Sequence, residues 1–105
     1  RIVIPPSESV QLIYQFSNRF KYFIDWGGAL IWVEAFELSE EMFESIRKKV
    51  VKHSGYITMI KNSEYLPYVE DVFTIGRDRF NISQNIKKSF DPKRILNPGK
   101  MYTGI

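Results

Sequence analysis

The sequence predicts an α+β domain of the ferredoxin-like type, in which two helices cover one face of a four-stranded antiparallel sheet. Apolar patterns through residue 61 follow the order β-α-β-β-α-β, and the third and second strands are joined by a Gly27-Gly28 pair. Residues 39–55 carry a full set of helix start and stop signals. We therefore expect a βαββαβ core in residues 1–61 and an extension in residues 62–105, with a helix and a docked tail.

The first strand and the first helix come from the opening 18 residues. RIVIPP alternates and then stops at two prolines, which lack the amide hydrogens that a strand needs. We expect Ser7 to be the N-cap of a helix that runs to about Asn18, because apolar residues follow it at three- and four-residue spacing.

The stretch RFKYFIDWGGALIWVEAF predicts a β-hairpin, because Gly27-Gly28 can take the positive φ angles of a two-residue turn. Pairing Trp26 with Ala29 fixes the register. The resulting pairs are Tyr22–Val33 and Ile24–Ile31 on one face, and Lys21–Glu34, Phe23–Trp32 and Asp25–Leu30 on the other. The second face is largely apolar, so we expect either the tail of this chain or a partner domain to cover it.

LSEEMFESIRKKVVKHSG predicts the second helix, with Ser39 as N-cap and Gly55 beyond its end. Phe43, Ile46 and Val50 form its apolar stripe. YITMIK predicts the fourth strand, and RDRFNISQNIKKSF predicts a third helix that ends before Pro92.

Composition excludes several kinds of site. The chain has no cysteine and a single histidine, His53, so disulfides, iron-sulfur clusters and structural zinc sites are not expected. No apolar run reaches the roughly 20 residues that span a bilayer. The chain begins with Arg1, which suggests a piece of a longer protein. Residues 1–76 hold eight Lys/Arg against ten Asp/Glu, whereas residues 77–105 hold seven against two, so the tail is the basic part.

No pattern in the chain predicts a complete active site. Phosphate-cradling glycine loops and nucleophile motifs are missing, so we expect no catalytic and no metal-binding residues. His53 could act as an acid or base, but a cation at a helix end is the better-supported interpretation. Asp25 could contact a ligand, although Asx residues beside a glycine turn more often stabilise the turn.

The tail is the strongest candidate for a binding element. FDPKR predicts a type I turn with Pro92 second, and NPGK predicts a type II turn with Pro98 second and Gly99 third. We expect both turns to expose backbone amides beside the basic side chains of Lys93, Arg94 and Lys100. Such an arrangement suits an anionic or electron-rich partner such as a cofactor edge, and a solvated basic tail is the alternative.

FDPKRILNPGKMY resembles the closing signature of FAD-linked oxidases with a vanillyl-alcohol-oxidase-type flavin domain. Within that family, VIPPSESV and IDWGGALIWVE resemble the C-terminal part of the E subunit of bacterial glycolate oxidase. The resemblance implies a C-terminal cap domain of an FAD-dependent 2-hydroxy-acid oxidoreductase, whose N-terminal FAD-binding domain is absent from this chain. By the same resemblance, Asn97, Gly99 and Lys100 would lie nearest the FAD.

The resemblance also implies partners. These are the chain's own FAD-binding domain, flavoprotein and iron-sulfur subunits of an oxidase, and a small 2-hydroxy acid. The absence of cysteine fits a reducing cytoplasm, so we expect a cytoplasmic protein that such a complex could bring to a membrane. The chain lacks the histidine-rich segments of related caps, which puts metal-assisted activation of the substrate in doubt, and we expect residues 1–105 alone to be inactive.

Two other functions remain open. The domain could be a non-catalytic interaction module that braces a multi-subunit oxidase. It could also be an RNA-binding module, since the ferredoxin-like layout is shared, but the aromatic motif of that class is incomplete here and the hairpin is acidic.

Overall fold

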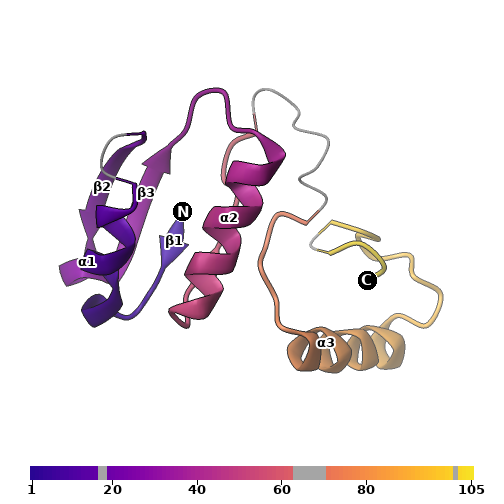
Figure 1. Ribbon diagram of the computed structural model, residues 1–105. Helices are drawn as coiled ribbons and strands as arrows, with labels where there is room; N and C mark the ends of the chain where they lie inside the picture. Colours follow the sequence, from indigo (N-terminus) through magenta and orange to yellow (C-terminus); the bar gives the residue numbers. More distant parts are fainter. Residues whose placement is uncertain (17–18, 63–70, 101) are drawn as a thin grey trace. The chain divides into compact units, whose positions relative to one another are not determined.

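The computed structural model describes residues 1–16, 19–62, 71–100 and 102–105. It divides the chain into two units, Arg1–Ile60 and Lys61–Ile105. The elements are β1 (Ile2–Val3), α1 (Pro6–Tyr14), β2 (Lys21–Asp25), the 3-10 turn η1 (Trp26–Gly28), β3 (Leu30–Glu34), α2 (Glu40–Lys52), β4 (Tyr56–Ile57) and α3 (Arg77–Phe90) (Figure 1).

The first unit contains one four-stranded sheet with the strand order β2-β3-β1-β4. Each neighbouring pair is antiparallel, so β3 lies between β1 and β2, and β1 lies between β3 and β4. Each helix therefore connects two strands that are separated by a third. This is the split βαβ arrangement, and the predicted ferredoxin-like fold is confirmed.

Helix α1 begins earlier than the sequence predicts. Its N-cap is Pro5 and its first helical residue is Pro6, so the prediction that Ser7 is the N-cap is wrong. The physical reason is that proline has a φ suited to the first turn of a helix, where its missing amide hydrogen costs nothing. The helix ends at Tyr14, and the predicted end near Asn18 lies outside the described residues.

The predicted register of the hairpin is confirmed at all five pairs, from Lys21–Glu34 to Asp25–Leu30. Trp26 O accepts a hydrogen bond from Ala29 N (3.2 Å), and both glycines between them have positive φ (59° and 99°). Trp26 also has a positive φ of 53°, which is uncommon for a bulky residue. A Cβ on Gly28 would lie 3.2 Å from Ser9 Oγ, so this glycine lets the turn approach α1 closely.

The core of the first unit lies between the sheet and its two helices. Ser39 caps α2 by accepting a hydrogen bond from Met42 N (3.2 Å), as predicted. The buried cluster draws on β1, α1, the turn after α1, β3 and α2, and consists of Ile2, Ile4, Leu12, Phe16, Ile31, Ile46 and Val50. Ile2 and Ile31 are register partners, so their side chains point to the same face of the sheet. Residues of α1 and of α2 pack in the same cluster with them, so both helices cover that face.

The other face of the sheet remains exposed at its β2 side. The side chains of Phe23 and Trp32, which pair across β2 and β3, are 64% and 40% exposed. Which partner covers this apolar face stays a prediction.

The second unit holds α3, whose bounds agree with the predicted third helix. Phe80 on this helix contacts Tyr102 (ring centroids 6.2 Å apart), and Tyr102 also contacts Phe73 (6.1 Å). In the described part of the chain, no helix is long and apolar enough to cross a membrane.

Candidate functional site

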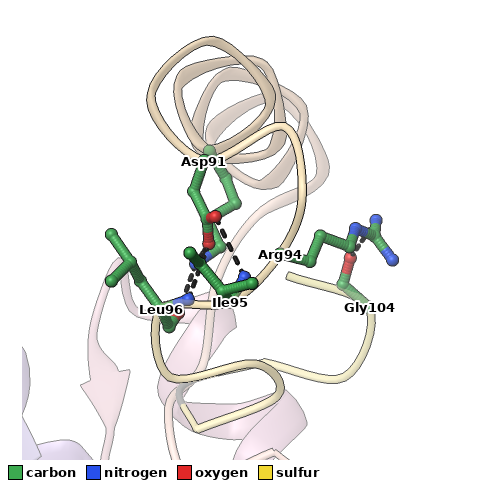
Figure 2. A network of polar contacts seen from close by, with 6 residues as sticks. Asp91, Arg94, Ile95, Leu96 and Gly104 are labelled. Carbon is green, nitrogen blue, oxygen red and sulfur yellow. Dashed lines mark hydrogen bonds and ion pairs between the residues drawn. The ribbon is translucent and has the colours of Figure 1, made fainter.

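The segment that follows α3 is held in a defined conformation by Asp91 (Figure 2). We refer to residues 91–105 as the C-terminal loop; Met101 lies outside the described residues. The Asp91 carboxylate is buried and accepts hydrogen bonds from Ile95 N (3.0 Å) and Leu96 N (2.9 Å). These two bonds turn the chain back toward the end of α3.

Lys87, one helical turn before Asp91, completes this anchor. Its Nζ lies 2.6 Å from Asp91 Oδ2 and also donates a hydrogen bond to the carbonyl of Leu96. The hydrogen bond from Lys87, followed by those from Leu96 and Ile95, lowers the pKa of Asp91 to about 2. Asp91 is therefore ionised at neutral pH, and the loop is fixed by a charged acceptor with three donors.

The two predicted turns are present in the C-terminal loop. Arg94 N donates to Asp91 O (3.0 Å) across Pro92, and Lys100 N donates to Asn97 O (3.3 Å) across Pro98 and Gly99. Gly99 has a φ of 68°, as the third residue of a type II turn requires.

The expectation that these turns expose their backbone amides is wrong. The amides of Arg94 and Lys100 close the turns themselves, and Gly99 N donates to Ile105 O (2.7 Å). The amides of Ile95 and Leu96 are occupied by Asp91. In the described part of the loop, the amides of Arg94, Ile95, Leu96, Gly99 and Lys100 are therefore occupied by acceptors of the second unit itself.

The later residues of the loop are tied to other parts of the second unit. The Arg94 guanidinium donates to Gly104 O (3.0 Å; Figure 2), and Thr103 N donates to Asp71 Oδ1 (2.7 Å). These contacts join the end of the loop to its beginning and to the segment before α3.

The structure brings Asn97, Gly99 and Lys100 together in one exposed turn. Asn97 has a positive φ of 46°, which asparagine tolerates better than most residues. A Cβ placed on Gly99 would meet no atom within 4 Å, so the backbone there is open to the approach of a ligand. The turn thus presents one amide side chain, one cation and a bare stretch of backbone.

The other two residues that we considered lie in the first unit and serve its structure. Asp25 Oδ1 accepts a hydrogen bond from Trp26 N (2.7 Å), which supports its interpretation as a turn-stabilising residue. His53 follows α2, and its Nδ1 lies 2.5 Å from Glu8 Oε2 on α1. This contact ties the two helices together and accounts for His53 without a catalytic role.

Asp91 is the residue that our sequence reasoning missed as an anchor. The sequence around Asp91 does indicate an unusual carboxylate, because Asp91 directly follows the predicted third helix, whose last turn contains Lys87 and Lys88. A carboxylate at this position is disfavoured by the helix dipole, so its presence calls for a different partner. The backbone amides that follow it are that partner.

An apolar surface accompanies the exposed turn. We define the apolar surface of the second unit by five side chains that are each more than half exposed: Ile82, Ile86, Phe90, Ile95 and Leu96. The first three recur every four residues on one side of α3. Apolar residues that lie exposed along one side of a helix are typical of an interface with another protein domain.

The side chains of the exposed turn have the chemistry of binding groups: an amide on Asn97 and a cation on Lys100. Among the residues described, no group of three His, Cys, Asp or Glu side chains could hold a metal ion. The exposed turn, Asn97–Lys100, contains no Asp, Glu, His, Cys or Tyr side chain. It can position and neutralise a ligand, and the reacting groups would have to come from elsewhere.

A family model described as the C-terminal domain of FAD linked oxidases matches residues 31–101, from β3 to the end of the exposed turn. No curated protein matches the chain. No solved structure matches it either.

Proposed function

The chain belongs to the family of C-terminal domains of FAD-linked oxidases, and we propose that it completes or braces the flavin site of its parent protein through Asn97, Gly99 and Lys100. The family implies FAD as the cofactor of the parent protein and an FAD-binding domain as the partner of this one. The observation that carries the proposal is the exposed turn, whose backbone is closed by hydrogen bonds to Asn97 O and Ile105 O while a Cβ on Gly99 would meet no atom within 4 Å.

The residues present fit a contact with the edge of FAD and do not fit a complete binding pocket. Gly99 leaves its backbone accessible, Lys100 supplies a positive charge and Asn97 supplies an amide that can both donate and accept hydrogen bonds. Five backbone amides of the described part of the loop, those of Arg94, Ile95, Leu96, Gly99 and Lys100, already have acceptors within it. Most of the contacts to FAD therefore belong to the FAD-binding domain.

When bound, FAD would be the electron acceptor for oxidation of the substrate. Lys100 would attract an anionic part of the cofactor or of the substrate, and Asn97 would orient a polar edge. The apolar surface of the second unit would exclude water from the same junction. We assign no proton transfer to this chain, and the isolated chain is inactive in our proposal.

The substrate that we propose is a small 2-hydroxy acid. The support is the similarity of IDWGGALIWVE and of the closing signature to the E subunit of bacterial glycolate oxidase. The same similarity supports flavoprotein and iron-sulfur subunits as further partners. The absence of cysteine supports a cytoplasmic location, from which the complex could associate with a membrane.

A second candidate function is a domain that braces the oxidase without touching its flavin. The apolar surface on α3 and the C-terminal loop favours it, because five exposed apolar side chains can bury against a neighbouring domain without any cofactor contact. The first function requires Lys100 to contact the cofactor or the substrate, whereas the bracing function does not.

The test replaces Lys100 by glutamine in the parent protein. We expect Lys100→Gln to lower flavin affinity or turnover by at least about tenfold, since a hydrogen bond from a charged group contributes roughly 1.5–3 kcal/mol. Lys93→Gln is the matched control, because Lys93 is also an exposed lysine of the C-terminal loop but lies in the other turn. If both variants keep wild-type flavin content and turnover, the bracing function replaces the contact.

A further inference from the structure

Strand β2 is an edge strand that nothing in the described part of the first unit protects. It is the outermost strand of the sheet and pairs with β3 alone. All five of its residues are exposed, and its three central side chains are apolar: Tyr22, Phe23 and Ile24 are 41%, 64% and 41% exposed. Proteins usually shorten, bend or charge the middle of such an edge, because it can pair with another strand.

The opposite edge of the sheet is different. There, β4 is only two residues long. A short edge offers few backbone groups to another chain. The edge at β4 therefore offers little backbone for pairing with another strand, whereas the edge at β2 offers five exposed residues.

The sequence of β2, KYFID, is complementary to itself when two copies run antiparallel about Phe23. Lys21 then lies opposite Asp25 of the other copy, and Asp25 lies opposite its Lys21. Tyr22 lies opposite Ile24, and the two Phe23 side chains face each other. Opposite charges and aromatic pairs on facing positions of antiparallel strands are stabilising.

The backbone of β2 presents the right groups for this register. A hydrogen bond joins Ile4 N to Ala29 O (3.0 Å), so Ala29 directs its carbonyl toward β1. Because backbone groups alternate sides along a strand, Leu30 and every second residue after it face β2. Their register partners on β2 are the odd-numbered residues, which leaves the amides and carbonyls of Tyr22 and Ile24 pointing away from the sheet.

We propose that β2 is a homodimerisation edge, at which two copies of this chain pair antiparallel about Phe23 to form one continuous eight-stranded sheet. Tyr22 and Ile24 of each copy exchange hydrogen bonds with Ile24 and Tyr22 of the other. The contact is isologous, as a two-fold dimer requires, because every pair is repeated by symmetry. It extends the chain's role beyond the flavin site to assembly of the parent protein.

The side chains at both ends of β2 are placed for this pairing. Lys21 Nζ lies 5.7 Å from the centre of the Phe36 ring, which holds it at the end of the strand. Asp25 uses Oδ1 for the amide of Trp26, and its other carboxylate oxygen can accept from Lys21 of the second copy.

Sedimentation equilibrium of the 105-residue chain, measured over a range of concentrations, tests the proposal. We expect a reversible monomer–dimer equilibrium. Lys21→Asp places like charges opposite each other and should weaken the dimer by about tenfold, whereas the double variant K21D/D25K restores opposite charges and should recover it. Lys61→Asp, which makes the same charge change outside every strand and helix, should leave the equilibrium unchanged.

Circular dichroism of each variant shows whether the fold is kept, and hydrogen exchange of the wild-type chain locates the interface. The amides of Tyr22 and Ile24 should become protected as the dimer forms. A chain that stays monomeric at every concentration, a dimer that leaves these two amides unprotected, or a double variant that fails to recover while it remains folded would each overturn the proposal.

Discussion

Asp91 shows how one buried carboxylate can shape a whole loop. It satisfies two backbone amides and a lysine at once, and it does so at the end of a helix where a negative charge has no favourable dipole. Its three donors outweigh the cost of burial, as the direction of its pKa shift indicates. This anchor fixes Ile95 and Leu96, the two residues that directly precede the turn Asn97–Lys100.

The anchor should fail only in strong acid. The pKa of Asp91 is lowered to about 2 in the folded chain from an ordinary 3.8, so its contribution to stability is complete above pH 3.8 and is lost as the pH falls through about 2. The amide proton shifts of Ile95 and Leu96, followed by NMR from neutral pH downward, should change with a midpoint near 2. A midpoint near 4 would show that the carboxylate is not bonded as described.

Asp91→Asn should disturb the same two amides at neutral pH, because the neutral side chain is a weaker acceptor. Asp78→Asn is the matched control, since Asp78 lies in the first turn of the same helix and far from the loop in sequence. It should leave the Ile95 and Leu96 signals unchanged.

The hairpin of β2 and β3 is the element that the sequence determines most completely. Two adjacent glycines fix the position of the turn, and the alternation of side chains then allows one register. Helix α2 was equally predictable, because Ser39, its acidic first turn and its apolar stripe all indicate the same bounds.

Two elements have bounds that differ from the predicted ones: α1, where two possible capping residues compete, and β4, whose partner strand is distant in sequence. At α1, Ser7 is a good capping residue, but two prolines before it are better suited to start the helix. Strand β4, predicted over residues 56–61, covers only Tyr56–Ile57, although Thr58 exchanges two further backbone hydrogen bonds with Arg1 (2.8 and 2.9 Å). The strand that pairs with β4 is distant in sequence, so the length of the pairing could not be predicted locally.

The junction of α2 and β4 depends on Gly55 for close packing. A Cβ on this buried residue would lie 2.9 Å from both Val3 O and Val50 Cγ1. We expect Gly55→Ala to lower the free energy of unfolding by about 1–3 kcal/mol, the usual effect of overpacking. Thermal denaturation measures the change.

Gly76→Ala serves as the comparison, because a Cβ there would meet no atom within 4 Å and the residue has a φ of −73°. Its effect should be much smaller than that of Gly55→Ala. Equal losses for the two variants would contradict the packing described at Gly55.

At the scale of the whole molecule, the family and the order of elements could be predicted from the sequence. The acceptors to which the backbone amides of the C-terminal loop donate could not be predicted. The turns at Pro92 and Pro98 are local, so their positions were predictable. The bond from Gly99 N to Ile105 O and the bond from Thr103 N to Asp71 each join residues that are apart in sequence. Only the folded unit shows that these amides have acceptors, and amides with acceptors are not available to bind an anion.

The two units divide the work of the domain in our account. The first supplies a ferredoxin-like framework with an open edge at β2, and the second supplies the exposed turn and its apolar surface. The flavin lies with the FAD-binding domain of the parent protein. The central claim is that Asn97–Lys100 touches it.

The most direct test of this claim is the flavin absorbance spectrum and the turnover of the parent protein with Asn97→Gly. Glycine accepts the positive φ at this position, so the variant removes the side-chain amide and leaves the turn intact. We expect a shifted flavin spectrum and turnover lowered by about tenfold, because one polar contact to the cofactor is lost. A spectrum and a turnover identical to those of the wild-type protein would contradict the contact between this turn and the flavin.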